Sequence, residues 1–255
     1  MNGRRYRAMK LVAVVLAVGS VPALAGRFGT ACQEDYQNGW QNTLPYSWAR
    51  CSNFNDELDD TDTKIWYYNL QGGKWWWEGS GDQEGLETVN IVFANTHGGA
   101  WSSDSVWAMW DQGDLAESGN MRLGNESWGT MIFSTYSCET LKYDDGLMWT
   151  RMGPIFRGGL YISTGSQHTV WAGWTTDDVG ADYADNLQHG YSIKEAWHDG
   201  AADWYVDNDL AVMTTGANSA DCSNRMSFMT WQNIASWPRL RDSQIGWYCY
   251  VAWHT

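Results

Sequence analysis

A histidine and a cysteine, each placed directly after a short apolar run, are the residue types in this sequence best suited to chemistry. Residues 91–96 lead to His97 and Gly98, and residues 130–137 lead to Cys138. A thiolate attacks a carbonyl carbon, and an imidazole is the usual group that takes the thiol proton. A backbone N–H beside the pair, such as that of Gly98, stabilises the negative oxygen that the attack creates. The pair therefore predicts nucleophilic catalysis at a carbonyl group.

The two apolar runs are typical of strands that are buried on both faces of a parallel sheet. We expect strands over residues 88–96 and 129–137. The carboxyl ends of neighbouring parallel strands meet at one edge of a sheet, where open α/β sheets place their sites. We therefore expect the Cys138 thiol and the His97 imidazole to meet at this edge.

Further strands and helices surround these two strands. We expect strands over residues 64–70, 105–110, 160–164, 210–215 and 246–253, and helices over residues 47–58, 144–152, 178–189 and 192–204. The helix at 144–152 is expected to end before Pro154, and Ser192 with Glu195 has the form of a capping box. Residues 26–85 are otherwise irregular and rich in tryptophan. The alternation of strands and helices predicts an α/β fold with a mainly parallel sheet flanked by helices.

The first 25 residues have the pattern of an export signal. A basic start precedes an apolar stretch over residues 11–21 that is too short to span a bilayer, and residues 23–25 give a small-residue cleavage pattern. We expect residues 1–25 to be removed and residues 26–255 to form a single α/β domain. No later stretch is long and apolar enough to cross a membrane. The expected location is therefore secreted or periplasmic, without a membrane partner after signal removal.

Acidic residues dominate the charge of the chain, whose formal net charge is −14 at pH 7. Such a surface repels phosphate backbones and anionic lipids, so we expect no nucleic-acid partner. No cofactor or metal is expected, because no metal-ligand spacing links the histidines. Acidic residues gather at 56–62 and at 111–114, but both groups lack the glycine and the distal glutamate of a calcium loop. We interpret them as solvated turns and keep a calcium site as an alternative. The oligomeric state stays open.

The five cysteines are an odd number, which leaves one thiol over in an oxidising compartment. Cys32 and Cys51 flank one short segment, and a second couple, Cys222 and Cys249, flanks another. Pairing within each couple is the simplest connectivity, because short loops close easily. Cys138 is then the free thiol. The alternative for Cys138 is an inert buried thiol or a bond to another chain.

The sequence around His97 and Cys138 resembles the caspase-like cysteine peptidases, the superfamily of caspases, metacaspases, gingipains, legumain and separase. In that superfamily a buried strand ends in His-Gly and the next core strand ends in the nucleophilic cysteine, about 50 residues later in caspases. Residues 91–98 match the first block, and residues 131–138 match the second. The resemblance covers residues 87–215 and is greatest to secreted bacterial members of unknown function.

The resemblance implies a peptide or protein substrate and gives each residue a role. Cys138 is the expected nucleophile, His97 the expected acid and base, and the Gly98 N–H an expected oxyanion donor. The resemblance also implies that the loop at residues 165–174 lines a specificity pocket. The candidate substrate-binding residues in this loop are His168, Trp171 and Trp174; the alternative, which we favour from the residues alone, is a surface loop whose aromatic residues pack on the core.

Two positions depart from the pattern of the superfamily. Caspases and metacaspases carry glycine soon after the nucleophile, whereas Cys138 is followed by Glu139. Tyr136 stands where metacaspase-like enzymes with basic specificity carry aspartate. Substrate preference therefore stays open, and so does an inactive relative that kept only the fold. Glu139 is either a third member that orients His97 or, as we favour, a solvated charge at a strand end.

A second class of function is suggested by the nineteen tryptophans. Exposed tryptophan faces stack on sugar rings, so a secreted carbohydrate-binding protein is the alternative. We expect most tryptophans to pack the loops onto the core. At least one of Trp75, Trp76 and Trp77 is expected to be exposed.

Overall fold

The structure is a computed structural model. It describes residues 26–36, 43–58, 63–68, 73–78, 85–110, 114–125, 129–202 and 207–255. The expected export signal, most of the acidic cluster at 56–62, Asp111 and Trp204 lie outside these residues.

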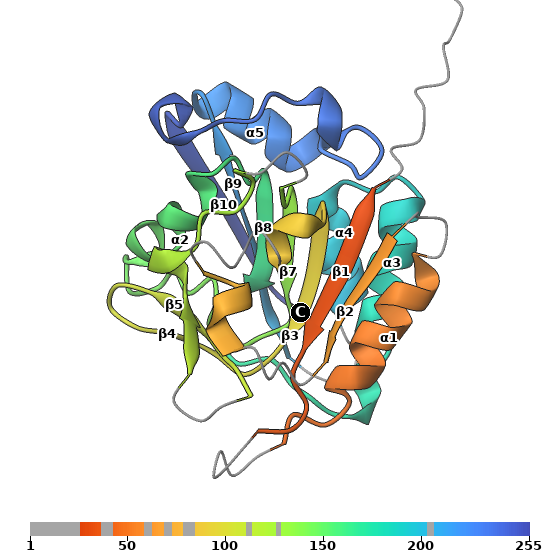
Figure 1. Cartoon of the computed structure of the whole chain (residues 1–255). Helices are drawn as coiled ribbons and strands as arrows, with labels where there is room; N and C mark the ends of the chain where they lie inside the picture. The colour runs from red at the N-terminus through yellow and green to blue at the C-terminus, as the bar shows by residue number, and fades with distance from the viewer. Residues whose placement is uncertain are drawn as a thin grey trace, which may run out of the picture.

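A seven-stranded sheet in the order β10-β9-β8-β7-β3-β1-β2 forms the centre of the fold (Figure 1). Its strands are β1 (Arg27–Cys32), β2 (Thr63–Tyr68), β3 (Ile91–Asn95), β7 (Ile132–Thr135), β8 (Ile162–Ser166), β9 (Asp209–Gly216) and β10 (Trp247–His254). The strands from β8 to β2 pair in parallel, whereas β9 is antiparallel to both of its neighbours. The expected α/β fold with a mainly parallel sheet is confirmed at this level.

The two strands that lead to His97 and Cys138 are central and adjacent. Every residue of β3 and of β7 is buried, and Ile91 pairs with Ile132 at the start of the register. Helices or loops cover both faces of these strands, so both faces must be apolar. This is why the sequence shows continuous apolar runs there instead of an alternating pattern.

Helices cover the two faces of the sheet unequally. On one face lie α1 (Ser47–Glu57), α3 (Val179–Gln188) and α4 (Ile193–Ala201), while α2 (Met148–Phe156) lies on the other (Figure 1). A small antiparallel sheet of β4 (Gly98–Ala100), β5 (Ser105–Ala108) and β6 (Leu115–Glu117) shares the face of α2, and α5 (Ser219–Phe228) packs against β9 and β10. Short 3-10 turns lie at residues 73–76, 86–88, 118–120, 174–176, 234–236 and 242–244. Within the described ranges, no helix is both long enough and apolar enough to cross a membrane.

Many of the aromatic residues serve the two apolar cores. Trp197 of α4 is buried on one face of the sheet, and Trp77 and Trp107 are buried on the other. Trp75, in contrast, is 47% exposed. The expectation that one tryptophan of the 75–77 run reaches solvent is therefore confirmed.

Two disulfides tie helices to the sheet. Cys32 at the end of β1 is bonded to Cys51 on α1, with Cα atoms 6.3 Å apart. Cys222 on α5 is bonded to Cys249 on β10, with Cα atoms 5.9 Å apart. Both separations are normal for disulfides, which persist in oxidising compartments. The predicted pairing is confirmed, and Cys138 is the free thiol.

Three features of the fold differ from the sequence prediction. β1 lies in the segment expected to be irregular, where Gly29 and Thr30 interrupt the apolar pattern of a six-residue strand. Pro154 was expected to stop α2, but it lies inside the helix, near its C-terminus. α5 was not predicted, since its sequence has little apolar periodicity. The capping box of Ser192 and Glu195 is confirmed.

Candidate active site

The two strand ends that carry His97 and Cys138 lie side by side. Because β3 and β7 are neighbouring parallel strands, the residues after both strands leave the same edge of the sheet. The Tyr136 N–H donates to the Ala94 carbonyl oxygen at 2.8 Å, and the Thr96 N–H donates to Ser137 Oγ at 3.3 Å. The two segments therefore meet at one sheet edge, and contact between the Cys138 thiol and the His97 imidazole stays a prediction.

This edge is also where the strand order reverses. From β1 the chain passes through α1 to β2, which pairs with one side of β1. The next strand of the same sheet, β3, pairs with the other side of β1, so the strand order reverses between β1 and β3. Open α/β sheets bind their ligands at the carboxyl ends of strands beside such a reversal. Tyr36, which follows β1, and His97, which follows β3, both lie at this point of the fold.

Gly98 is packed directly against the turn that carries Cys138. A Cβ atom at position 98 would lie 2.6 Å from the Cys138 carbonyl oxygen and 2.9 Å from Ser137 Cβ. Gly98 pairs with Trp107, and the ladder bond beside this pair runs from the Ala108 N–H to the His97 carbonyl oxygen. In an antiparallel ladder this arrangement turns the Gly98 N–H away from β5. The Gly98 N–H therefore has no partner on β5 and is a candidate oxyanion donor.

Tyr36 holds the His97 segment. The His97 N–H donates to the Tyr36 hydroxyl oxygen at 2.8 Å, and the two rings lie 5.0 Å apart between centroids. Burial raises the pKa of Tyr36 far above its ordinary value; the hydrogen bond from His97 opposes this shift, and the charge of an ionised Cys138 adds to it. The Tyr36 hydroxyl thus lies within electrostatic reach of the thiol. Sequence reasoning missed Tyr36, because nothing near it in the sequence marks it.

The Cys138 thiol is partly buried. Its Sγ donates to the Val170 carbonyl oxygen at 4.0 Å. Burial raises the pKa of Cys138, the interaction with Val170 opposes this shift, and the charge of Glu139 adds to it. The resting thiol is therefore protonated at neutral pH, and a base must remove its proton before it can attack.

The turn after Cys138 has an unusual backbone. Glu139 has φ 55°, a left-handed conformation that glycine adopts readily and that few other residues adopt without strain. Its carboxylate accepts a hydrogen bond from Lys142 Nζ at 2.8 Å, and its N–H donates to the His168 carbonyl oxygen at 2.9 Å. The ion pair with Lys142 agrees with the favoured interpretation of Glu139 as a charge at a strand end. It gives no support to the alternative, in which Glu139 orients His97.

His168 belongs to an ion-pair network. Its Nδ1 lies 2.6 Å from Asp209 Oδ2 and its Nε2 lies 3.3 Å from Asp144 Oδ2. The hydrogen bond to Asp209, followed by that to Asp144, raises the pKa of His168, while burial opposes the shift. Burial would raise the pKa of Asp209, but hydrogen bonds from His168 and His254 hold it below its ordinary value. His168 therefore contacts the Cys138 turn through its main chain, and both of its ring nitrogens face carboxylates.

The two tryptophans of the same loop are exposed. Trp171 is 57% exposed and Trp174 is 73% exposed. The main chain of Trp171 accepts a hydrogen bond from the Tyr136 hydroxyl at 2.9 Å, which fixes the loop beside the end of β7. The structure thus brings the loop to the site, with both indole rings largely in solvent.

Arg50 on α1 is a buried residue of this region that sequence reasoning missed. Its guanidinium donates to the Thr176 carbonyl oxygen at 2.8 Å, to the Gly173 carbonyl oxygen at 3.1 Å and to Asn95 Oδ1 at 3.1 Å. It also lies over the Tyr136 ring, 5.3 Å from the centroid. Arg50 therefore joins the ends of β3 and β7 to the 173–176 loop, and burial lowers its pKa below the ordinary value.

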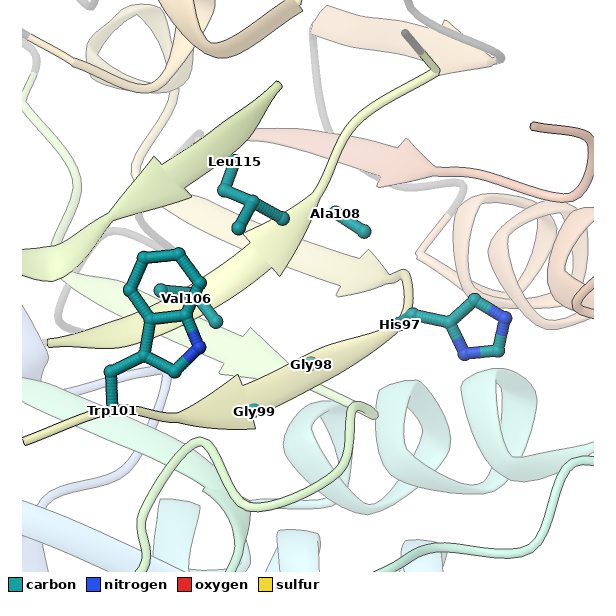
Figure 2. Close-up of a pocket in the computed structure, with 7 residues that line it drawn as sticks. All are labelled: His97, Gly98, Gly99, Trp101, Val106, Ala108 and Leu115. Atoms are coloured by element: carbon teal, nitrogen blue, oxygen red, sulfur yellow. The ribbon is translucent and has the colours of Figure 1, made fainter. Parts of the chain in front are cut away.

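A pocket of about 150 Å³ opens beside the His97 segment (Figure 2). Its lining residues are His97, Gly98, Gly99, Trp101, Val106, Ala108 and Leu115. Figure 2 shows the His97 imidazole pointing away from Trp101, Val106 and Leu115. The pocket itself is therefore apolar, and it adjoins the candidate oxyanion donor.

In the described ranges, no group of three or more histidine, cysteine or acidic side chains has an arrangement that could hold a metal ion. His189 and His198 pair with neighbouring aspartates on α3 and α4, and His254 pairs with Asp209. Most of the acidic residues behind the calcium alternative lie outside the described residues.

Comparison with known protein families gives a match over most of the chain. The sequence profile of a family described as a domain of unknown function, DUF6345, matches residues 31–253. No curated protein matches the chain. The matched range includes every residue of the candidate site.

Proposed function

Because the chain belongs to the DUF6345 family, whose description assigns no activity, we propose a function from the geometry of the site: a secreted cysteine peptidase that hydrolyses a peptide bond through Cys138 and His97. The observation that carries the proposal is the packing of Gly98 against the Cys138 turn. This packing holds a histidine, a free thiol and a candidate oxyanion donor at one sheet edge. The resemblance of both strand ends to caspase-like peptidases supports the same assignment.

The reaction begins with a neutral thiol. His97 takes the proton of Cys138 as Sγ bonds to the carbonyl carbon of the substrate, and the carbonyl oxygen becomes negative. The N–H groups of Gly98 and Cys138 donate hydrogen bonds to this oxygen. The carbon–nitrogen bond then breaks, His97 gives its proton to the leaving amine, and an acyl thioester remains on Cys138.

Water completes the cycle. His97 removes a proton from a water molecule as the water oxygen attacks the thioester carbon. The carbon–sulfur bond breaks, the acid product leaves, and the proton returns from His97 to the Cys138 sulfur. The raised pKa of Cys138 favours this general-base route, because the thiol holds its proton until substrate is present.

Two groups position the reacting pair without entering the reaction. Tyr36 accepts the His97 N–H and packs against the imidazole. Arg50 binds Asn95, two residues before His97, and contacts the ring of Tyr136, two residues before Cys138. Arg50 is buried and Tyr36 is half-buried, and their contacts hold the two strand ends in place.

The site variants test this proposal directly. Purified mature protein is incubated with a mixture of unstructured peptides, and products are identified by mass spectrometry. We expect cleavage that is lost in Cys138→Ala and reduced at least about 100-fold in His97→Ala, since general-base catalysis contributes on the order of 10²–10⁴. His189→Ala is the control for the loss of an exposed histidine. Cleavage that persists in Cys138→Ala would refute the proposal, and no cleavage by the wild type would favour an inactive relative.

An aromatic surface supports the second candidate function, carbohydrate binding. An open groove of about 450 Å³ runs along the edge strand β10, where Tyr143 stacks on Tyr250 with ring centroids 4.8 Å apart. Trp247 in the same groove is 53% exposed. Exposed aromatic faces stack on sugar rings. Polysaccharide binding that survives Cys138→Ala and is lost in Trp247→Ala would favour this function.

A further inference from the structure

We propose that the pocket beside His97 and Gly98 binds the side chain of the substrate residue on the leaving-group side of the scissile bond, and that it selects an apolar side chain such as leucine. This inference rests on the proposed peptidase function, and it names the substrate preference of the same site.

The pocket lies on the outer face of the small sheet. Gly98 pairs with Trp107, which is fully buried in the core, so this pair faces inward. Adjacent residues of a strand face opposite sides. The next pair, Gly99 with Val106, therefore faces outward and forms the floor of the pocket.

Glycine at position 99 keeps this floor open. A Cβ atom there would lie 3.5 Å from Val106 Cγ2, an ordinary contact, so a side chain would fit and would occupy the pocket. Trp101 forms one wall and is 50% exposed, which leaves the pocket open to solvent on that side. A substrate side chain can enter without a rearrangement of the backbone.

The lining determines the chemical class of the occupant. Among the described residues that line the pocket, the only one with an ionisable side chain is His97, whose imidazole points away from the apolar side chains (Figure 2). A charged or strongly polar side chain would lose its hydration there without gaining a partner. An apolar side chain gains free energy by leaving water.

The volume of the pocket fits a side chain of medium size. An apolar cavity of about 150 Å³ is large enough to hold a benzene ring. The pocket has the same volume. A leucine, methionine or phenylalanine side chain therefore fills it, whereas glycine leaves it empty.

The chemistry determines the side of the scissile bond. His97 gives its proton to the leaving amine, so it must lie on the leaving-group side of the bond, with Cys138 at the carbonyl carbon. The pocket is lined by Gly98, Gly99 and Trp101, which follow His97, and by His97 itself, whose imidazole points away from the apolar side chains. The substrate residue that enters the pocket is therefore the one that supplies the leaving amine.

Binding to the inactive protein tests the pocket separately from catalysis. Leucinamide and glycinamide, which correspond to products on the leaving-group side, are added to the Cys138→Ala protein and detected by saturation-transfer NMR. We expect transfer to the leucine methyl groups and at least about tenfold weaker binding of glycinamide, from the free energy of burying a leucine side chain. Gly99→Val fills the pocket and Trp101→Ala removes its wall, so each should reduce leucinamide binding. Trp75→Ala, which removes a similarly exposed tryptophan outside the pocket, should leave it unchanged.

Cleavage of matched peptides provides the second readout. Peptides that differ only in the residue after the scissile bond are compared by kcat/KM, with leucine expected at least about tenfold above glycine and aspartate. Selective leucinamide binding without cleavage by the wild type would support the pocket and refute the proposed function. Cleavage without a preference for leucine, or with a preference unchanged in both Gly99→Val and Trp101→Ala, would refute the pocket and leave the peptidase function standing. Loss of both readouts would refute both.

Discussion

Replacement of Gly98 by alanine tests the packing on which the site depends. The added Cβ atom would lie 2.6 Å from the Cys138 carbonyl oxygen, 2.9 Å from Ser137 Cβ and 3.0 Å from Thr140 Cγ2. Two of these neighbours are fixed by the backbone of the Cys138 turn, which is itself bonded to the 166–168 segment. The alanine can be accommodated only if this turn and the β4 strand move apart.

The magnitude follows from the cost of overpacking a rigid site. Inserting a methyl group into a packed region costs about 1–3 kcal/mol. For a domain of this size a loss of about 2 kcal/mol lowers the melting temperature by roughly 4–8 °C. Gly99→Ala is the matched control, because its Cβ atom meets only Val106 Cγ2, at 3.5 Å. We expect Gly99→Ala to melt within about 2 °C of the wild type.

Two assays follow the consequence of Gly98→Ala. Urea unfolding measures the loss of stability, and iodoacetamide labelling of Cys138 measures the exposure of the thiol. We expect Gly98→Ala to be less stable and to label faster, because the turn has moved away from β4. Equal stability and equal labelling of Gly98→Ala and Gly99→Ala would refute the reasoning that places β4 against the Cys138 turn.

Further predictions concern the buried arginine, the thiol and the ion-pair network. Arg50→Met should destabilise the fold by about 3 kcal/mol or more in urea unfolding, because it leaves several buried oxygen acceptors without donors; a loss below about 1 kcal/mol would contradict this. Since burial raises the pKa of Cys138, its labelling rate should rise with pH toward a midpoint above the ordinary value of about 8.5, and a midpoint below about 7 would contradict the general-base route. The pKa of His168 is raised in the folded state, so its ion pairs stabilise the fold fully below the ordinary histidine pKa of about 6.5. This stabilisation is lost as the pH rises through the pKa of His168 in the folded state. His168→Gln should therefore cost about 0.5 kcal/mol near pH 5.5 and almost nothing near pH 9, and equal costs would count against the network.

Sequence patterns alone predicted the strands and helix boundaries whose residue types are required by burial, by a turn or by a cap. The apolar runs over β3 and β7 are visible because both strands are buried on both faces. The turn at Gly190 and the Ser192–Glu195 capping box mark the boundary between α3 and α4, because a positive φ and a backbone cap each require particular residue types. The placement of His97 and Cys138 at one edge followed from the parallel sheet.

Tertiary contacts determine the parts that the sequence did not predict. β1 is a strand because it pairs with β2 and β3 on its two sides, and a six-residue segment with Gly29 and Thr30 has no strand signal of its own. Tyr36 and Arg50 reach the site from elements that are distant from it in sequence, so their contacts with His97 and Asn95 could not be read from spacing. The pocket has the same origin, since it forms only when β4, β5 and β6 pair.

Trapping of the acyl-enzyme tests most directly whether Cys138 and His97 act together on a carbonyl group. A peptide ester is mixed with the protein, the reaction is stopped in acid, and the modified residue is identified by mass spectrometry. We predict an acyl thioester on Cys138 in the wild type and much slower formation of this thioester in His97→Ala. Cys138→Ser, quenched in the same way, should carry no thioester, and any adduct at this position would be an oxygen ester on the serine. The absence of an adduct on Cys138, or equal rates in the wild type and His97→Ala, would contradict the account.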